Sequence, residues 1–266
     1  EVPLIPVQKW FFEHEFEDLN HFNQAFLFTL KEDGNRDIIE KTLNVLVNHH
    51  DGLRLRFRKE DMWIQWYENP EKASVSVEQI DLSSVPEDIL SVFITEKCNS
   101  LQSSLNITEG PVIRSSLFKG HKDGLDRLFI VIHHLCIDMV SWRIIIEDFH
   151  NIYRTLSDCL TPSLPAKTSS YRDWAKSLME YVSTAEKHSD YWLEVLRDVS
   201  PIPVKYKESK FSDIRDYKVS LSPHDTDLLL NAVPSVYDTQ INDILLSALL
   251  LACNRSLNVS DMVINL

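Results

Sequence analysis

The sequence predicts a mixed α/β fold, because stretches with strand periodicity and stretches with helix periodicity follow one another along the chain. Residues 53–58 alternate leucine or phenylalanine with arginine, and this period of two is typical of a half-buried strand. Residues 128–132 form a continuous apolar run, as in a strand buried on both faces. Residues 142–156 carry apolar side chains at helical spacing and predict a long amphipathic helix.

The other elements of the first half follow from the same two periodicities. Pro6 marks the start of a predicted helix, since its fixed φ suits the first helical turn. Further helices are predicted over 38–47 and 86–98, and strands over 22–30 and 62–67. The strand at 62–67 is expected to pair with 53–58 as a hairpin, through a short charged turn. We expect the side chains of Arg56 and Arg58 to be solvated.

The second half begins with a change of composition. Residues 161–170 are rich in proline, serine and threonine and predict a loop, whereas 171–197 predicts an aromatic, helical segment. The remaining predicted elements are a linker over 201–210, a strand over 217–221, helices from Pro223 and over 239–254, and a buried strand over 262–266. Because a natural terminus usually frays in polar residues, an end inside an apolar run predicts a fragment of a longer protein.

Composition and charge argue against several classes of protein. The 266 residues suffice for one large domain or two small ones. With 27 basic and 40 acidic residues, the net charge of −13 repels phosphate backbones, so no nucleic acid partner is expected. No apolar run reaches the ~18 residues of a membrane span, and the start shows no secretory signal pattern. The four cysteines lie far apart without a CxxC pair, which predicts reduced thiols in a cytoplasmic protein.

The stretch from Ile132 to Arg143 holds the strongest candidate for chemistry. His133 and His134 end the predicted buried strand, and Asp138 follows where a loop becomes a helix. A histidine at the rigid end of a strand can act as a general acid or base near neutral pH. Adjacent strand residues point to opposite faces, so both histidines are not expected to bind one metal ion, and one should face the core. Asp138 either pairs with an arginine or caps the helix, and a purely structural role for all three residues is also open.

Several motifs, in order along the chain, resemble the condensation-type domains of nonribosomal peptide synthetases. The His133-His134-x-x-x-Asp138 pattern is similar to their core motif HHxxxDG. Other similar segments are PLIPVQKWFFE at 3–13, HFNQ at 21–24, HHDGLRLRF at 49–57, DYW at 190–192 and YDTQINDILL at 237–246. The Ser-Trp-Arg-Ile sequence at 141–144 and the Trp-Phe-Phe sequence at 10–12 resemble the epimerization branch more than the branch that forms peptide bonds.

The resemblance implies a fold like chloramphenicol acetyltransferase, with two α/β lobes and an active-site tunnel between them. Residues 1–160 would then be the N-terminal lobe, 161–211 a linker, and 212–266 the start of the C-terminal lobe. The first lobe would be complete and the second only begun. Met139, Ser141 and Trp142 would line the tunnel, with the alternative that Trp142 is a buried side chain that anchors its helix.

The resemblance also implies an enzyme that epimerizes the α-carbon of an aminoacyl or peptidyl thioester from L to D. The substrate would arrive on the 4'-phosphopantetheine arm of a peptidyl carrier protein domain, beside neighbouring synthetase modules, and the domain itself would bind no metal or organic cofactor. His134 would be the catalytic histidine and His133 its structural partner. Asp138 would pair with Arg54 and hold the motif loop in place.

Two departures from the family pattern keep other functions open. Met139 stands where the motif has glycine, and the family's catalytic glutamate follows a strand resembling 262–266, beyond the last residue of this chain. The isolated chain is therefore expected to lack one catalytic group. One alternative is a condensation domain that forms peptide bonds with the same His134. The other is a catalytically inactive module that only binds carrier proteins.

Overall fold

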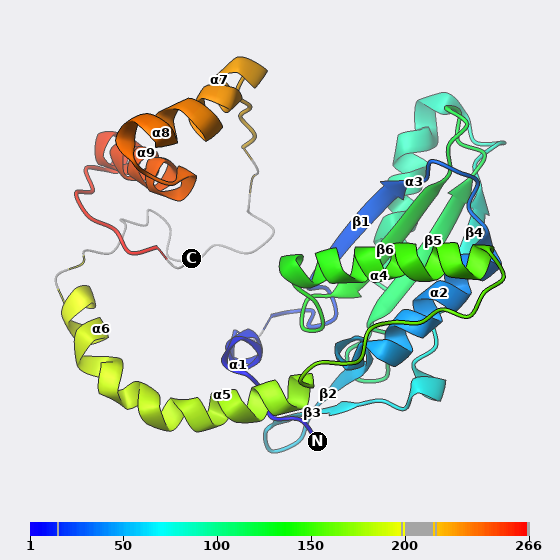
Figure 1. Cartoon of the computed structure of the whole chain (residues 1–266), viewed down its shortest axis with the longest axis horizontal. Helices are drawn as coiled ribbons and strands as arrows, with labels where there is room; N and C mark the ends of the chain where they lie inside the picture. Colours follow the sequence, from blue (N-terminus) through cyan, green and yellow to red (C-terminus); the bar gives the residue numbers. More distant parts are fainter. Residues whose placement is uncertain (15, 198, 200–214, 216, 265–266) are drawn as a thin grey trace. The chain divides into compact units, whose positions relative to one another are not determined.

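A computed structural model describes residues 1–14, 16–197, 199, 215 and 217–264 and divides the chain into two compact units (Figure 1). Unit 1 comprises Glu1–Thr184 and unit 2 comprises Ala185–Leu266. The linker predicted over 201–210 lies outside the described residues. The candidate site lies in unit 1.

Unit 1 is built on a four-stranded mixed sheet in the order β1-β6-β5-β4. The strands are β1 (Asn23–Thr29), β4 (Val77–Asp81), β5 (Ile113–Lys119) and β6 (Arg127–His133). β6 runs antiparallel to both of its neighbours, whereas β4 and β5 are parallel. A separate hairpin pairs β2 (Leu55–Lys59) with β3 (Trp63–Tyr67), as predicted. All four strands predicted in the first half are confirmed.

Helices cover both faces of the four-stranded sheet. They are α2 (Arg36–His49) and α4 (Met139–Ser157) on one face and α3 (Glu87–Gln102) on the other (Figure 1). Apolar residues of α2 and α4 share a core with the inner residues of β5 and β6, including Leu43, Ile145 and Ile132. The helix α1 (Pro6–Glu13) packs its phenylalanines against the β2–β3 hairpin. Because side chains alternate between the two faces of each strand, the sheet contributes apolar residues to two separate cores, one on each face.

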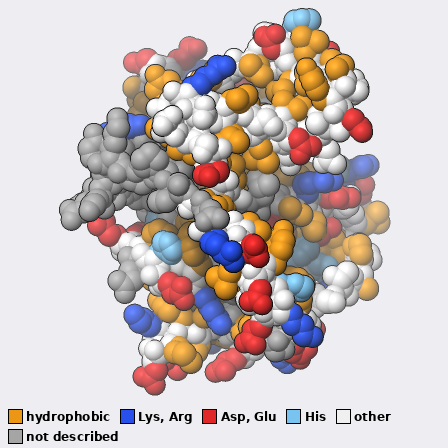
Figure 2. All heavy atoms as spheres, turned by 90° about the vertical axis from the view of Figure 1, so that its left-hand side faces the viewer, with side chains coloured by type: hydrophobic (Ala, Val, Ile, Leu, Met, Phe, Trp, Pro, Cys, Tyr) orange, Lys and Arg blue, Asp and Glu red, His pale blue; other side chains and the backbone are white. Residues whose placement is uncertain are grey.

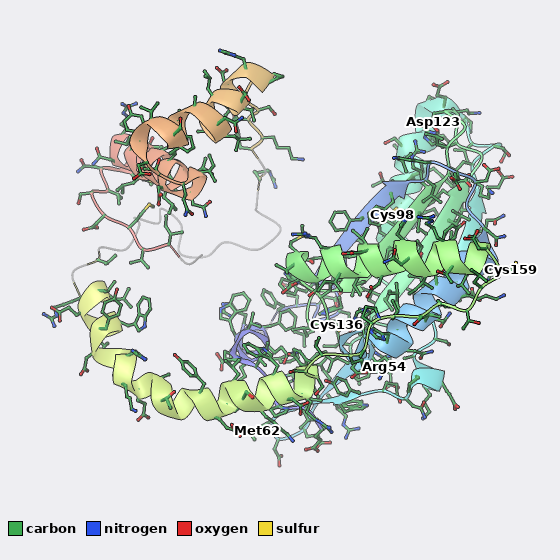
Figure 3. All side chains as sticks on the ribbon, viewed as in Figure 1. Arg54, Met62, Cys98, Asp123, Cys136 and Cys159 are labelled. Atoms are coloured by element: carbon green, nitrogen blue, oxygen red, sulfur yellow. The ribbon has the colours of Figure 1, made fainter. Side chains whose placement is uncertain are left out.

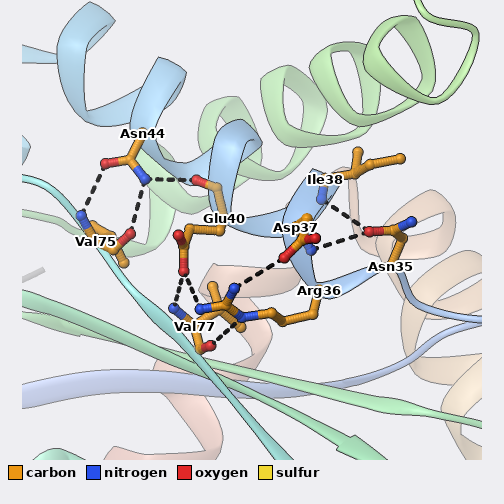
Figure 4. Close-up of polar contacts among 8 residues, drawn as sticks. All are labelled: Asn35, Arg36, Asp37, Ile38, Glu40, Asn44, Val75 and Val77. Atoms are coloured by element: carbon orange, nitrogen blue, oxygen red, sulfur yellow. Dashed lines mark hydrogen bonds and ion pairs between the residues drawn. The ribbon is translucent and has the colours of Figure 1, made fainter.

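Side-chain hydrogen bonds fasten the start of α2 to the chain at β4 (Figure 4). Asn35 caps the helix by accepting hydrogen bonds from the backbone N–H groups of Asp37 and Ile38. Glu40 accepts from the backbone N–H of Val77 at 2.9 Å and also pairs with Arg36. Asn44 accepts a hydrogen bond from the backbone N–H of Val75 through Oδ1 and donates to its carbonyl oxygen through Nδ2. These bonds satisfy backbone groups next to an edge strand, where no further strand is available.

Two strands, β4 and β5, were not predicted. The middle of β5 carries Arg114, Ser115 and Ser116, which interrupt any apolar pattern. Ser115 is nevertheless buried, because its hydroxyl donates to the carbonyl oxygen of Phe129 at 2.8 Å. Of the three, Ser115 is thus satisfied inside the sheet, whereas Nε of Arg114 and Oγ of Ser116 are buried without a hydrogen-bond partner among the described residues.

Arg56 corrects the expectation that both arginines of β2 are solvated. Arg58 is exposed, but Arg56 is only 2% exposed. The backbone at Gly110 lies directly over its guanidinium, so that a Cβ added there would stand 2.3 Å from Nη2 of Arg56. Gly110 also has a φ of +84°, and both features favour glycine at this turn.

Unit 2 is helical in its described part. Its α-helices are α6 (Ser189–Leu196), α7 (Pro223–Asp227), α8 (Val233–Tyr237) and α9 (Ile241–Leu257), and α5 (Tyr171–Ala185) leads from unit 1 into it. The predicted helices are confirmed, with a short 3-10 turn between α5 and α6. The predicted strand at 217–221 is wrong: these residues have no regular structure, and Tyr217 is 96% exposed.

A strand needs a partner for its backbone hydrogen bonds, and the described part of unit 2 contains none. Met262–Ile264 likewise forms no strand, while Asn265 and Leu266 lie outside the described residues.

The molecular surface carries charges of both signs. On the face shown in Figure 2, acidic and basic side chains are interspersed among hydrophobic ones. Among the described residues, no helix combines the length and the apolar character that crossing a membrane requires.

Candidate active site

The two histidines of the motif face opposite sides of the sheet. His133, the last residue of β6, is 0% exposed, and its Nε2 lies 2.8 Å from the carbonyl oxygen of Leu19. Its ring meets that of Phe11 edge to face, with centroids 6.0 Å apart. His134 follows the strand and is half-buried. His133 is therefore the histidine that faces the core, which the sequence pattern left open.

Burial controls the titration of His133. It lowers the pKa of this imidazole to about 4, because the charged form loses its hydration inside the protein. The neutral ring keeps its hydrogen bond with Leu19 and holds the end of β6 near the loop that precedes β1.

This buried histidine predicts a pH dependence of stability. His133 takes up a proton near pH 6.5 when unfolded but only near pH 4 when folded. The unfolded state therefore binds more protons in between, and the free energy of unfolding should fall by about 3 kcal/mol as the pH falls through this range. Urea unfolding at several pH values measures the loss. The His133→Gln variant, which keeps a donor for Leu19, should lose about 3 kcal/mol less over the same pH range, and an unchanged loss would contradict the assignment.

His134 is held by contacts on three sides. Its Nδ1 lies 2.7 Å from the carbonyl oxygen of Ile137, and its Nε2 lies 3.2 Å from Nε2 of Gln24. Its ring stacks on that of Phe22, with centroids 4.9 Å apart and planes 21° apart. The backbone N–H of His134 also donates to the carbonyl oxygen of Phe22 at 2.7 Å. The imidazole is thus fixed in position and orientation before any substrate is present.

Gln24 is a site residue that the sequence analysis gave no role. It lies on β1, opposite Ile132 of β6, and its Oε1 accepts a hydrogen bond from the indole Nε1 of Trp142 at 2.9 Å. Trp142 is 2% exposed and packs edge to face on Phe26, as a tryptophan that anchors its helix would. The signal in the sequence was a glutamine among the phenylalanines of one strand face.

Asp138 caps helix α4. Its Oδ1 accepts a hydrogen bond from the backbone N–H of Ser141 at 2.7 Å, and hydrogen bonds from Ser141 hold its pKa below the usual value. Met139 is the first residue of the helix and is 61% exposed. Its φ is not positive, so the backbone at this position does not require the glycine of the motif.

Arg54 does not pair with Asp138, which corrects the predicted ion pair. Arg54 lies in the short 3-10 turn that follows α2 (Figure 3). Its Nη2 binds Oδ1 of Asp51 at 2.7 Å. Its Nη1 donates to the carbonyl oxygens of Val47 and Asn48 at the end of α2. These partners use the guanidinium, while the helix cap uses the Asp138 carboxylate. The capping alternative for Asp138 is therefore the one confirmed.

A double-mutant cycle tests this reassignment. We expect Arg54→Ala and Asp51→Ala to couple by about 1–3 kcal/mol in the free energy of unfolding, because the two side chains share a partly buried ion pair. Arg54→Ala and Asp138→Ala should add to within about 0.5 kcal/mol. Chemical denaturation of the single and double variants measures both values. Strong coupling between Arg54 and Asp138 would restore the pair expected from the sequence.

A second polar group lies beside the site. His50 and Asp148 form a pair between the end of α2 and α4, with 2.8 Å from Nε2 to Oδ2. They line a cavity of about 470 Å³ that Ser141 also lines. Of the predicted site residues, the structure thus brings His134 and Trp142 together through Gln24, and it places Asp138, Met139 and Ser141 at the start of α4. Arg54 stands apart from them.

Comparisons with known proteins extend over the whole chain. Residues 1–266 match the profile of the condensation domain. The chain is 33% identical over 273 residues to gramicidin S synthase 1 of Brevibacillus brevis, a match that includes all of this chain and 24% of that protein. It is 34% identical over 274 residues to tyrocidine synthase 2 of Brevibacillus parabrevis, again over all of this chain but only 8% of that protein.

Solved structures share the fold. The epimerization domain from the third module of tyrocidine synthetase B has a TM-score of 0.88 at 30% identity, over 97% of this chain and 60% of that one. The starter condensation domain of rhizomide synthetase has a TM-score of 0.61 at 19% identity, over 73% of this chain and 47% of that one. These matches confirm the predicted fold class, a mixed α/β fold of the condensation and epimerization type. The chain spans 60% of the length of the epimerization domain and a quarter or less of these two synthases.

Proposed function

Because the chain belongs to the condensation-domain family of nonribosomal peptide synthetases, we propose that it is part of an epimerization domain. Its substrate is an aminoacyl or peptidyl thioester on the 4'-phosphopantetheine arm of a loaded peptidyl carrier protein, and its product is the D-configured residue on the same arm. The domain supplies no metal or organic cofactor of its own, and it works between neighbouring modules of one synthetase.

One observation carries the choice of epimerization over condensation. The chain is 30% identical to the epimerization domain of tyrocidine synthetase B and superposes on it over 97% of its length. The segments Trp10-Phe11-Phe12 and 141–144 favour the same branch.

Epimerization requires a base that removes the α-proton, and His134 is the candidate. A thioester acidifies its α-hydrogen, but removal of the proton still requires a positioned base, and inversion requires a proton delivered to the opposite face. His134 is half-buried at the end of a rigid strand and held by Ile137, Gln24 and Phe22. We assign to His134 the proton transfer on one of the two faces of the α-carbon. The family resemblance implies that a glutamate serves the opposite face.

Two observations bear on the alternatives. The matched profile is that of the condensation domain as a whole, so amide formation with the same His134 is the second candidate. An inactive carrier-binding module was suggested by Met139 and by the absence of the family's glutamate from this chain. The backbone of Met139, whose φ is not positive, removes the first of these grounds, since the motif loop forms its helix cap without a glycine.

Deuterium wash-in at the α-carbon tests the proposal. A carrier-bound aminoacyl or peptidyl thioester is incubated in D2O with the 266-residue chain and with a longer version that has the length of the epimerization domain, and the released product is analysed for chirality. We expect label and D-residue with the longer version. If the α-hydrogen is not exchanged by the longer version, epimerization is excluded. Amide formation after addition of an acceptor carrier would then identify a condensation domain, and no reaction would identify a carrier-binding module.

A further inference from the structure

Gln24 connects Trp142 to His134. Its carbonyl oxygen Oε1 lies 2.9 Å from the indole nitrogen of Trp142, and its amide nitrogen Nε2 lies 3.2 Å from Nε2 of His134. The three side chains come from β1, from the residue that follows β6, and from α4. All three elements belong to unit 1, and Trp142 is buried in its core.

The chemistry of the partners fixes the direction of each hydrogen bond. An indole N–H can only donate, so the group of Gln24 that faces Trp142 must be the carbonyl oxygen. The amide NH₂ of Gln24 therefore faces His134 and donates to it. A backbone carbonyl can only accept, so Nδ1 of His134 must carry the hydrogen that bonds Ile137. The hydrogen bonds at the two ring nitrogens therefore indicate the same tautomer: the proton is on Nδ1, and Nε2 is an acceptor.

We propose that Gln24, oriented by Trp142, is a positioning residue that holds His134 as the neutral Nδ1–H tautomer and so makes Nε2 the atom that accepts a proton. Phe22 stacks on one face of the ring and keeps it in the plane of these bonds. The hydrogen-bond assignment stands independently of the reaction. Its consequence for catalysis rests on the proposed epimerization.

In that reaction, Nε2 takes the α-hydrogen as a proton, the C–H electron pair passes into the enolate of the thioester, and His134 becomes an imidazolium. The amide of Gln24 occupies the lone pair of Nε2 in the free chain, so it must move aside when the substrate arrives. After Nε2 is protonated, return of the Gln24 amide to its original place would set its NH₂ against the new N–H, donor against donor. This arrangement opposes retention of the proton and favours its return to carbon or to solvent.

¹⁵N spectra of histidine-labelled protein test the assignment without any turnover. The 266-residue chain is recorded at about pH 8, above the ordinary histidine range, and the His134 signals are identified by their loss in His134→Ala. We expect a protonated Nδ1 and an unprotonated, hydrogen-bonded Nε2. In Gln24→Met the Nε2 signal should move toward that of a free acceptor. In Gln24→Glu, whose carboxylate accepts from both neighbours, both nitrogens should be protonated.

The same substitution at another strand is the matched control. Gln79 is exposed on β4, so Gln79→Met should leave the His134 signals unchanged. His133 and Asp138, the neighbouring groups that titrate, are present in every Gln24 and Gln79 variant. A proton found on Nε2 in the unsubstituted chain would overturn the proposal. Unchanged His134 signals in both Gln24 variants would overturn it as well. A correct tautomer combined with no α-proton exchange in D2O would instead reject the proposed function alone.

Discussion

Replacing His134 with alanine is expected to lower α-proton exchange by about 10²–10⁴-fold, the range that a positioned acid–base group contributes. The ring is fixed by Ile137, Gln24 and Phe22, so its loss removes a base that is already in place. Deuterium wash-in with the longer version of the domain measures the rate. Because the side chain is half-buried and packs mainly on one phenylalanine, the variant should remain folded, which circular dichroism checks.

A matched control comes from the same region of the chain. His150 is exposed on α4, and His150→Ala should exchange the α-proton at the rate of the unsubstituted domain. If His134→Ala also kept that rate, the motif histidine would have no part in the chemistry, and the reactive groups would have to be sought elsewhere.

Replacing Trp142 with alanine is expected to lower the free energy of unfolding by about 3–5 kcal/mol. Trp142 is among the largest fully buried side chains, and it shares the core between α2, α4 and the sheet with Leu43 and Ile132. Alanine would leave a cavity there and would also release the carbonyl oxygen of Gln24. Urea unfolding measures the change.

The conservative variant Trp142→Phe separates packing from hydrogen bonding. It keeps most of the buried ring but removes the indole N–H, so it should cost much less than alanine while still freeing the amide of Gln24. A loss in Trp142→Ala below about 1 kcal/mol would mean that the tryptophan is not part of the core.

The sequence predicted those elements whose apolar residues recur with one clear period. The strand β6 is a continuous apolar run and the helix α4 is apolar at helical intervals, so they were found at nearly their true ends. The strand β5 was missed because Arg114, Ser115 and Ser116 interrupt its apolar pattern, and the bond from the Ser115 hydroxyl to Phe129 of the neighbouring strand exists only in the folded sheet. The segment 217–221 has strand composition, but the described part of unit 2 offers it no strand to pair with. Pairing is a property of the fold and cannot be read from a segment alone.

The site shows the same division. The alternation along β6 predicted that one histidine faces the core, but only the contacts with Leu19 and Phe11 identify it as His133. The choice between an arginine pair and a helix cap for Asp138 depended on where Arg54 finds other acceptors. Gln24 was visible as a polar residue among phenylalanines, yet its role depends on a helix more than a hundred residues away in the chain.

The adjacent histidines make the site sensitive to strand register. Asn23 stands opposite His133, and Gln24 opposite Ile132, so the antiparallel pairing of β1 with β6 decides which histidine meets the amide. Since side chains alternate between faces with a period of two, a slip of one residue in β6 would exchange the two imidazoles. The reactive ring would then be buried against Phe11, and the core ring would be presented to Gln24. An insertion or deletion of one residue within β6 therefore amounts to an active-site mutation, even though every residue of the motif is still present.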